Sequence, residues 1–222
     1  SLAKALGIAS IGYQNPALPP QKLSGALMVV EGFGDADFYF LERMYQRFHG
    51  IPWTVIETGR CLLREQTLGD LDAMYQIYQG RSIAKYIEPL HEDREKEEEY
   101  TKAYIQNMYA FYGYGMWAAV EKATGRIIGK AGLNNRELHG KPSLELGYLI
   151  GEAYQGQGFA TELCGGILQF AKEATEFEEI HCLIEKGNEI SVHLAEKLGF
   201  RWQERLKIQG RDMQRYTKPL QF

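Results

Sequence analysis

The sequence has few cysteines and no arrangement of residues that is typical of a metal site. Its three cysteines, Cys61, Cys164 and Cys182, lie far apart and include no Cys-x-x-Cys pair. A disulfide framework and a zinc site are therefore not expected. The five histidines also lack the spacing of metal ligands. We expect a reduced, cytoplasmic protein without a metal.

Long apolar segments and basic clusters are absent as well. No apolar stretch approaches the roughly 20 residues that cross a bilayer, and the first residues lack the pattern of a signal peptide. The formal net charge is -4 and the basic residues are scattered, which argues against a nucleic-acid partner. The one dense charged run, residues 91–99, is mostly acidic and is typical of a solvated helix face.

The pattern of strands and helices changes near residue 58. Residues 1–57 differ in texture from residues 58–222, which we interpret as one domain. Strands are predicted at 60–66, 114–121, 126–136, 144–150 and 179–185, with two more within 200–218, and helices after Thr67 and at 92–112, 158–175 and 189–198. This order predicts an α+β fold, in which a mixed, mostly antiparallel sheet is flanked by helices.

A glycine-bearing loop joins the strand at 144–150 to the helix that begins near Gly158. Gly156 and Gly158 expose backbone N–H groups, and the following helix adds its unpaired first-turn N–H groups and its positive dipole end. Such a loop fits an anion, including a pyrophosphate. An ordinary tight turn is the alternative. A Rossmann loop fits poorly because Thr161 stands at the sixth position, and the Gly-Lys-Ser/Thr ending of a P-loop is absent.

Two segments together resemble the GNAT acetyltransferase superfamily over about residues 60–218. Gln155, Gly158 and Ala160 match its Gln/Arg-x-x-Gly-x-Gly/Ala signature, and residues 188–200 are similar to its Asn-x-x-Ser and Glu-Lys-Leu-Gly-Phe block. The Glu-Leu-Gly-Tyr stretch at 145–148 most resembles the branch of ribosomal-protein N-terminal acetyltransferases. The resemblance implies the GNAT acyl-CoA N-acyltransferase fold, with acetyl-CoA as co-substrate and an amine as acceptor.

The resemblance also implies how acetyl-CoA would be held. The pyrophosphate would meet backbone N–H groups of the loop, and the pantetheine arm would pair with the open edge of the preceding strand. Asn188 would bond the pantetheine, and Ser191 would reach a phosphate of CoA; a helix N-cap is the alternative role of Asn188. The residues implied in cofactor binding are Tyr148, Leu149, Ile150, Gln155, Gly156, Gln157, Gly158, Phe159, Ala160, Asn188 and Ser191.

Glu145 is the candidate catalytic base for a direct attack of the amine on the thioester. It stands on the strand two residues before Gly147, and a carboxylate that points to solvent or pairs with a basic residue is the alternative. A backbone N–H near Tyr148 or Leu149 would stabilise the oxyanion. The position at which many relatives carry a tyrosine acid is Ala195 here, which leaves the general acid unassigned.

Several aromatic residues and two helix glycines have open roles. The cluster of Tyr109, Phe111, Tyr112, Tyr114 and Trp117 either lines the acceptor pocket or, in the interpretation we favour, belongs mostly to the core. Gly165 and Gly166 lie inside a predicted helix, and we interpret them as a place where helix and sheet pack closely.

Residues 3–49 resemble the C-terminal tail of a haloacid-dehalogenase-like phosphatase, a Rossmann-like fragment. Ala5-Leu6-Gly7 and Leu23-Ser24-Gly25-Ala26 carry this loose resemblance, with a helix expected at 37–49. None of the catalytic acidic residues of such enzymes can be assigned in this segment, so no phosphatase activity is expected from it.

The leading hypothesis is an enzyme that moves an acetyl group from acetyl-CoA to a primary amine, on a protein N-terminus or a small molecule. A CoA-binding or interaction module without catalysis is the main alternative, motivated by Ala195, and a regulatory appendage of a phosphatase is the third. The sequence does not identify the acceptor. It also leaves the oligomeric state open, with a homodimer as one option.

Overall fold

The described residues form two compact units, and the boundary in the chain falls between Trp53 and Thr54. A computed structural model describes residues 2–23, 25–34 and 36–220. The stretch 54–57, which the sequence grouped with the N-terminal segment, forms strand β3 (Thr54–Glu57) of the larger unit. This strand pairs with β4 (Cys61–Arg64) and buries Ile56. The larger unit therefore starts four residues before the boundary that composition suggests.

The smaller unit contains the helix that the sequence predicts at 37–49. Two short strands, β1 (Ile11–Tyr13) and β2 (Met28–Val30), pair in parallel, and they are preceded by α1 (Leu2–Ala5) and followed by α2 (Phe38–Phe48). Helix α2 begins after Asp37, whose Oδ1 accepts the N–H of Phe40 at 2.8 Å. Ser24 belongs to the proposed phosphatase-like motif and lies outside the described residues. The phosphatase resemblance stays a prediction.

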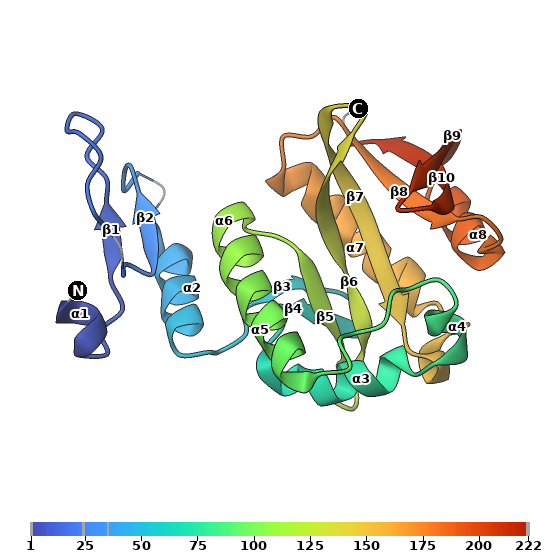
Figure 1. Ribbon diagram of the computed structural model, residues 1–222, viewed down its shortest axis with the longest axis horizontal. Coiled ribbons are helices and arrows are strands. Elements are labelled where there is room, and N and C mark those ends of the chain that lie inside the picture. The colour runs from blue at the N-terminus through green and yellow to red at the C-terminus, as the bar shows by residue number, and fades with distance from the viewer. Residues whose placement is uncertain (1, 24, 35, 221–222) are drawn as a thin grey trace. The chain divides into compact units, whose positions relative to one another are not determined.

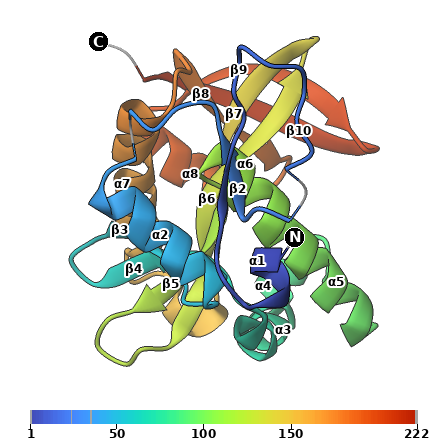
Figure 2. The same ribbon diagram turned by 90° about the vertical axis from the view of Figure 1, so that its left-hand side faces the viewer.

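The larger unit is built around one twisted sheet of eight strands, counted over the described residues (Figure 1; Figure 2). The strand order is β3-β4-β5-β6-β7-β8-β10-β9. All neighbours run antiparallel except β7 and β8, which run parallel. The remaining strands are β5 (Met116–Glu121), β6 (Ile127–Leu138), β7 (Lys141–Ile150), β8 (Glu179–Glu185), β9 (Arg201–Ile208) and β10 (Arg211–Pro219). The predicted mixed, mostly antiparallel sheet is confirmed.

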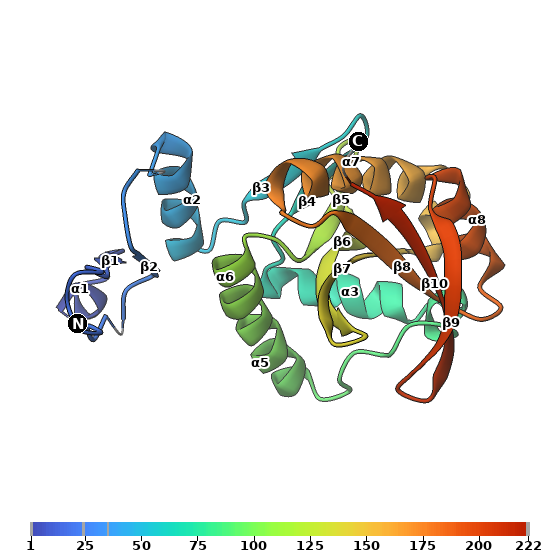
Figure 3. The same cartoon turned by 90° about the horizontal axis from the view of Figure 1, so that it is seen from above.

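Helices cover both faces of this sheet (Figure 3). Helix α7 lies on one face, and α3 and α5 lie on the other. The helices of this unit are α3 (Leu71–Tyr78), α4 (Arg81–Ala84), α5 (Arg94–Tyr104), α6 (Ala110–Tyr112), α7 (Phe159–Ala174) and α8 (Glu189–Lys197). The short α4 was not predicted, because four residues after Gly80 show no periodicity that a sequence pattern can detect.

The core lies between the sheet and α7. Leu163, Cys164 and Ile167 of that helix are fully buried against the sheet face that carries Leu133 and Leu144. Trp117 is also fully buried, and its ring meets Phe170 edge to face at 5.2 Å between centroids. Burial of a large aromatic side chain contributes strongly to stability. The favoured core role is confirmed for Trp117.

The helix predicted at 92–112 is interrupted. It starts at Arg94, because the Oδ1 of Asp93 accepts the N–H of Glu95 at 3.0 Å and caps the helix there. A wider π-helical turn (Ile105–Tyr109) separates α5 from α6. Such turns insert one extra residue per turn and are frequent near functional sites. Gly113 ends the segment with φ of 73°, a conformation that favours glycine.

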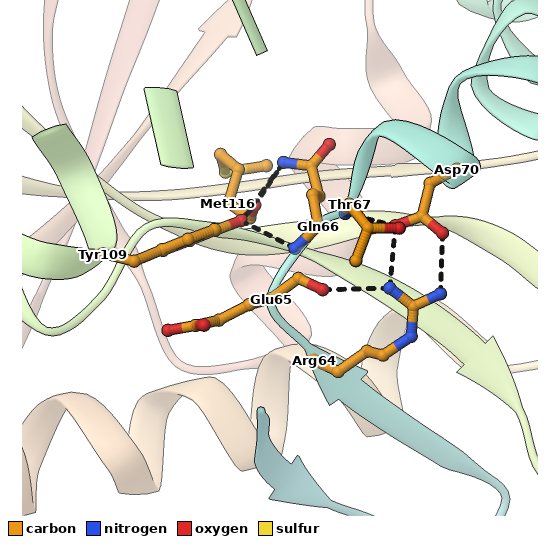
Figure 4. Close-up of polar contacts among 7 residues, drawn as sticks. All are labelled: Arg64, Glu65, Gln66, Thr67, Asp70, Tyr109 and Met116. Carbon is orange, nitrogen blue, oxygen red and sulfur yellow. Dashed lines mark hydrogen bonds and ion pairs between the residues drawn. The ribbon is translucent and has the colours of Figure 1, made fainter. Parts of the chain in front are cut away.

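A polar network fixes the chain where β4 leads into α3 (Figure 4). The guanidinium of Arg64 makes two bonds of 2.7 and 2.8 Å to the carboxylate of buried Asp70, and Asp70 also accepts the N–H of Thr67 at 2.8 Å. The carbonyl of Met116 accepts from the side-chain amide of Gln66 and from the hydroxyl of Tyr109, each at 2.6 Å. Because buried polar groups must find partners, these bonds define one path for the chain.

The two glycines inside α7 have different surroundings, and we predict different effects of alanine there. A Cβ at Gly165 meets no atom within 4 Å, whereas one at Gly166 lies 3.0 Å from Cγ2 of Ile56 and 3.3 Å from Cγ2 of Thr58. Gly165→Ala is expected to raise the free energy of unfolding by about 0.5–1 kcal/mol, the usual gain inside a helix. Gly166→Ala is expected to raise the free energy of unfolding by less than this amount, or to lower it. Urea unfolding compares the two; an equal gain at both would contradict close packing at Gly166.

Candidate functional site

The two parallel strands β7 and β8 pair over a short distance and then separate. Their ladder consists of two pairs, Leu144 with Ile180 and Glu145 with His181. Beyond it, β7 continues to Ile150 along β6, while β8 continues to Glu185 along β10. The edges of residues 146–150 and 182–185 face each other but are therefore not joined by backbone hydrogen bonds. An extended chain with amide groups fits between two such edges.

The loop after β7 presents a row of backbone N–H groups. Gly156 and Gly158 have φ of 71° and 83°, which favours glycine, and Gly158 is the residue before α7. Among the described residues, no acceptor is bonded to the N–H groups of residues 156–161. The N–H of Gln155 differs, because it donates to the carbonyl of Glu152 at 3.2 Å. The available donors therefore begin at Gly156, and they join the positive end of a 16-residue helix.

Arg60 holds this loop in place. Its Nε donates to Glu162 Oε2 at 2.7 Å, its backbone N–H donates to Oε1 of the same carboxylate at 2.7 Å, and its Nη1 donates to the carbonyl of Gln157 at 3.0 Å. The guanidinium also lies 4.1 Å from the centroid of the Phe159 ring. Sequence reasoning missed this role, since Arg60 and Glu162 are about a hundred residues apart and no local pattern connects them.

Side chains brace the other end of the loop. The side-chain amide of Gln155 donates to the carbonyl of Ile150 at 2.8 Å and to the hydroxyl of Ser82 at 3.1 Å. The backbone N–H of Ser82 donates to the carboxylate of Glu152 at 2.7 Å. These bonds tie α4 to the end of β7. The loop is thus fixed before any ligand enters, which lowers the entropic cost of binding.

A cleft of about 890 Å³ runs between the separated strands and under α3, α4 and α5. It contains Glu145 and most of the predicted cofactor residues: Tyr148, Leu149, Ile150, Gln155, Gly156, Gly158, Phe159, Ala160, Asn188 and Ser191. Gln157 is not among the residues that line it. Its carbonyl bonds Arg60, and its side-chain amide donates to the carbonyl of Ala153 at 2.8 Å.

Asn188 and Ser191 are already engaged with other groups of the protein. The Oδ1 of Asn188 accepts the N–H of Ser191 at 3.2 Å and caps α8, which is the alternative that the sequence left open. The hydroxyl of Tyr148 donates to Oγ of Ser191 at 3.0 Å. Tyr148 thus joins β7 to α8 across the point where the strands separate. The side-chain N–H₂ group of Asn188 has no acceptor among the described residues and stays available to a ligand.

Glu145 is a buried carboxylate at the narrow end of the opening. It is 7% exposed and forms an ion pair with the Nε of Arg136. Burial raises the pKa of Glu145 above its ordinary value of 4.5, and Arg136 offsets only part of this effect. The partnership with a basic residue, the alternative reading from the sequence, is therefore present, but the carboxylate also lines the cleft. A carboxylate that lines the cleft and has a raised pKa is a candidate proton acceptor.

The five aromatic residues of the predicted cluster do not form the wall of the cleft. Tyr109 and Tyr114 are buried in the core, while Phe111 is 79% exposed. None of the five residues of the predicted cluster is among the lining residues of the described chain. Aromatic lining comes instead from Tyr78, Tyr86, Tyr100 and Tyr104, together with Tyr148, Tyr154 and Phe159. The sequence shows Tyr78, Tyr100 and Tyr104 only as part of helical apolar faces, and a helix face that packs on a sheet looks the same as one that covers a cleft.

Several charged side chains that were not predicted as site residues line the cleft, among them Glu97 and Lys130. Burial lowers the pKa of Lys130 to about 8. The strand β6 carries Lys130, Asn134 and Arg136 at alternate positions, and all three line the cleft. This alternation of polar residues with the apolar ones of the core is a signal that sequence reasoning could have used.

Ala195 and the cysteines contribute no reactive group to this site. Ala195 is buried on α8, so the position of the tyrosine acid is occupied by a core methyl group. All three cysteines are buried and free, and burial raises the pKa of Cys61 to about 11 and that of Cys164 to about 12. Within the described part of the chain, no three His, Cys, Asp or Glu side chains gather as metal ligands do, and no helix is long and apolar enough to cross a membrane.

Comparison with known families gives one match that covers most of the larger unit. Residues 60–201 match the family described as acetyltransferase (GNAT) domain. The uncharacterized protein YkkB of Bacillus subtilis (strain 168) is 28% identical over 96 residues, which cover 43% of this chain. The chain thus spans little more than half of that relative, 56% of its length.

Solved structures share the fold. A putative GNAT-family acetyltransferase from Bordetella pertussis superposes with a TM-score of 0.62 at 24% identity, over 75% of this chain and 99% of that one. A putative ribosomal-protein-serine acetyltransferase from Vibrio cholerae gives 0.62 at 20%, over 74% and 96%. The Microcin C7 self immunity acetyltransferase MccE, in complex with acetyl-CoA and AMP, gives 0.60 at 17%, over 72% and 93%.

The raised pKa of Glu145 predicts a pH dependence of stability. A carboxyl that binds protons more tightly in the folded state stabilises that state below pH 4.5, and this contribution is lost as the pH rises through the folded pKa. The stability of the wild type should therefore fall relative to that of Glu145→Gln as the pH rises from 4.5. Urea unfolding of both proteins between pH 4 and pH 8 measures the difference. If the stability of the wild type instead rises relative to that of Glu145→Gln, the effect of the ion pair with Arg136 on the pKa of Glu145 outweighs the effect of burial.

Proposed function

The chain belongs to the GNAT acetyltransferase family, and we propose that it transfers the acetyl group of acetyl-CoA to a primary amine by direct attack. The separation of β7 and β8, continued by the row of free N–H groups at residues 156–161, is the observation that carries this proposal. The two features follow each other along the chain, so one ligand with an amide-bearing arm and a diphosphate fits both. Acetyl-CoA has these two parts in this order.

The geometry supports a placement in which the two features bind different parts of acetyl-CoA. The pantetheine arm lies between residues 146–150 and 182–185 and uses their open edges, as an added strand would. The diphosphate accepts N–H bonds from Gly156 onward at the positive end of α7. The side-chain amide of Asn188, which has no acceptor in the described structure, donates to the arm. The acetyl group then lies near Gly147 and Tyr148.

Glu145 is the proposed base. Its Oε2 bonds Arg136, and Oε1 has no partner among the described residues, so one oxygen remains to take a proton directly or through a water. A backbone N–H at Tyr148 or Leu149 stabilises the oxyanion that forms when the amine attacks. Because Ala195 stands at the position of the acid, the leaving thiolate takes its proton from the amine or from water.

The alternative is a CoA-binding module that has lost catalysis, and Ala195 is the residue that favours it. The two proposals agree on the cofactor and differ in turnover. We keep residues 3–49 as a proposed phosphatase-like tail, which the parallel pairing of β1 and β2 supports. A cytoplasmic location and a homodimer also remain proposals.

Acetyl-CoA is expected to raise the melting temperature of the protein, since a ligand that binds only the folded state at 100 times its Kd adds about 2.7 kcal/mol. Gly158→Trp places a large side chain at the start of α7 and should abolish this rise. Gly125→Trp is the matched control, because Gly125 also has a positive φ, of 69°, and lies in the β5–β6 turn. An unchanged response of Gly158→Trp would remove the loop from the site.

Glu145→Gln is expected to lower kcat by about 10²- to 10⁴-fold, the usual contribution of a positioned base. The response of the melting temperature to acetyl-CoA should stay as in the wild type, because the predicted contacts of the cofactor do not include this carboxylate. Release of free thiol with a panel of amines measures the rate. A wild-type rate in the variant would show that another group accepts the proton, and no turnover by the wild type would favour the non-catalytic module.

A further inference from the structure

The ammonium of Lys130 lines the cleft and makes no direct bond to a charged side chain among the described residues. The charged residues of β6, β7 and α5 that line the cleft are Glu97, Lys130, Arg136 and Glu145. Arg136 and Glu145 form an ion pair, and the carboxylate of Glu97 accepts the N–H of His91 at 3.0 Å. No hydrogen bond or ion pair joins the ammonium of Lys130 to any group in the described residues. Glu97 attracts this ammonium only through space, so an anionic ligand that bonds it directly would offset more of the cost of burial.

The surroundings of Lys130 leave room for such a ligand. Its Nζ lies 5.1 Å from the centroid of the Tyr78 ring on α3, a weak cation–π contact that leaves the three N–H donors free. Glu97 on α5 acts on Lys130 from a distance and offsets only part of the effect of burial. With a pKa of about 8, the ammonium is still mostly charged at neutral pH. It is therefore available as a donor to an anion in the cleft.

Lys130 lies on the same face of the sheet as Glu145, close to the place proposed for the acetyl group. It pairs with Leu149 across β6 and β7, while Gly132 and Asn134 on the same strand pair with Gly147 and Glu145. Alternate residues of a strand share a face, so Lys130 and Glu145 face the same side of the sheet, under α3 and α5. Leu149 and Glu145 are four residues apart on β7, about 13 Å at the rise of a strand. The acetyl group, placed near Gly147, lies between them.

We propose that Lys130 binds a carboxylate of the acceptor, so that the acceptor is an amine which also carries an acidic group. This inference rests on the proposed acetyl transfer, since it places the amine beside the thioester. One molecule then reaches from the thioester, where Glu145 receives the proton of the amine, to the ammonium of Lys130. The carboxylate is either the α-carboxylate of an amino acid or short peptide, or an acidic side chain near a peptide N-terminus.

The test compares acidic amines with neutral partners of the same shape. Amino acids and dipeptides are paired with their C-terminal amides, and peptides with Asp or Glu at the first three positions are paired with the Asn or Gln forms. For the full chain, kcat/KM should be about tenfold to hundredfold higher for the acidic member of at least one series, the usual effect of a charged hydrogen bond. The series that shows the preference identifies which carboxylate is bound.

Lys130→Met should abolish the preference, and Lys130→Arg should retain part of it. Lys207→Met is the matched control, because Lys207 is exposed on β9 and is not among the residues that line the cleft. Equal rates for acidic and neutral acceptors in the wild type, or an unchanged preference in Lys130→Met, would overturn the proposal.

A second measurement separates this proposal from the proposed function. The N-acetylated form of each acidic probe and its amide are titrated calorimetrically into the CoA-bound protein, which requires no turnover. Tighter binding of the acid, lost in Lys130→Met, supports the role of Lys130 even if no amine is acetylated. Equal binding of acid and amide by the wild type contradicts it even if acetyl transfer is observed.

Discussion

The site depends on the separation of two parallel strands after a ladder of two residue pairs. Each strand keeps its outer neighbour, β6 for β7 and β10 for β8, so the separation leaves only the inner edges without a partner. Backbone N–H and C=O groups inside a protein need partners, and a pair of open inner edges is costly unless an extended ligand completes the sheet. The separation therefore creates the binding place for an amide-bearing chain.

The helices that follow the two strands are arranged by the same separation. Helix α7 begins nine residues after β7 ends, and α8 begins four residues after β8 ends, so both N-termini lie beyond the open ends of the strands. Arg60 and the side chain of Gln155 hold the loop before α7 in place. The backbone N–H groups of residues 156–161 have no acceptor in the described protein. Rigid donors lose little entropy when an anion binds.

The sequence predicts the order of elements well and the acceptor side of the site poorly. The glycines of the loop are a local signal, and Gly156, Gly158 and Glu145, which were proposed from the sequence, line one cleft. The role of Arg60 and the position of Lys130 depend on pairs that only the folded sheet creates, so no local pattern could reveal them. The tyrosines of α3 and α5 were not assigned to the cleft, because helical periodicity shows which face is apolar but not what that face covers.

Amide hydrogen exchange with and without acetyl-CoA tests the central claim most directly. The account predicts that bound acetyl-CoA slows exchange at three places together: residues 146–150, residues 182–185 and residues 156–161, where the donors now lack acceptors. Unchanged exchange in these segments under saturating acetyl-CoA, with protection elsewhere or nowhere, would contradict it. The opening between β7 and β8 would then not be the cofactor site.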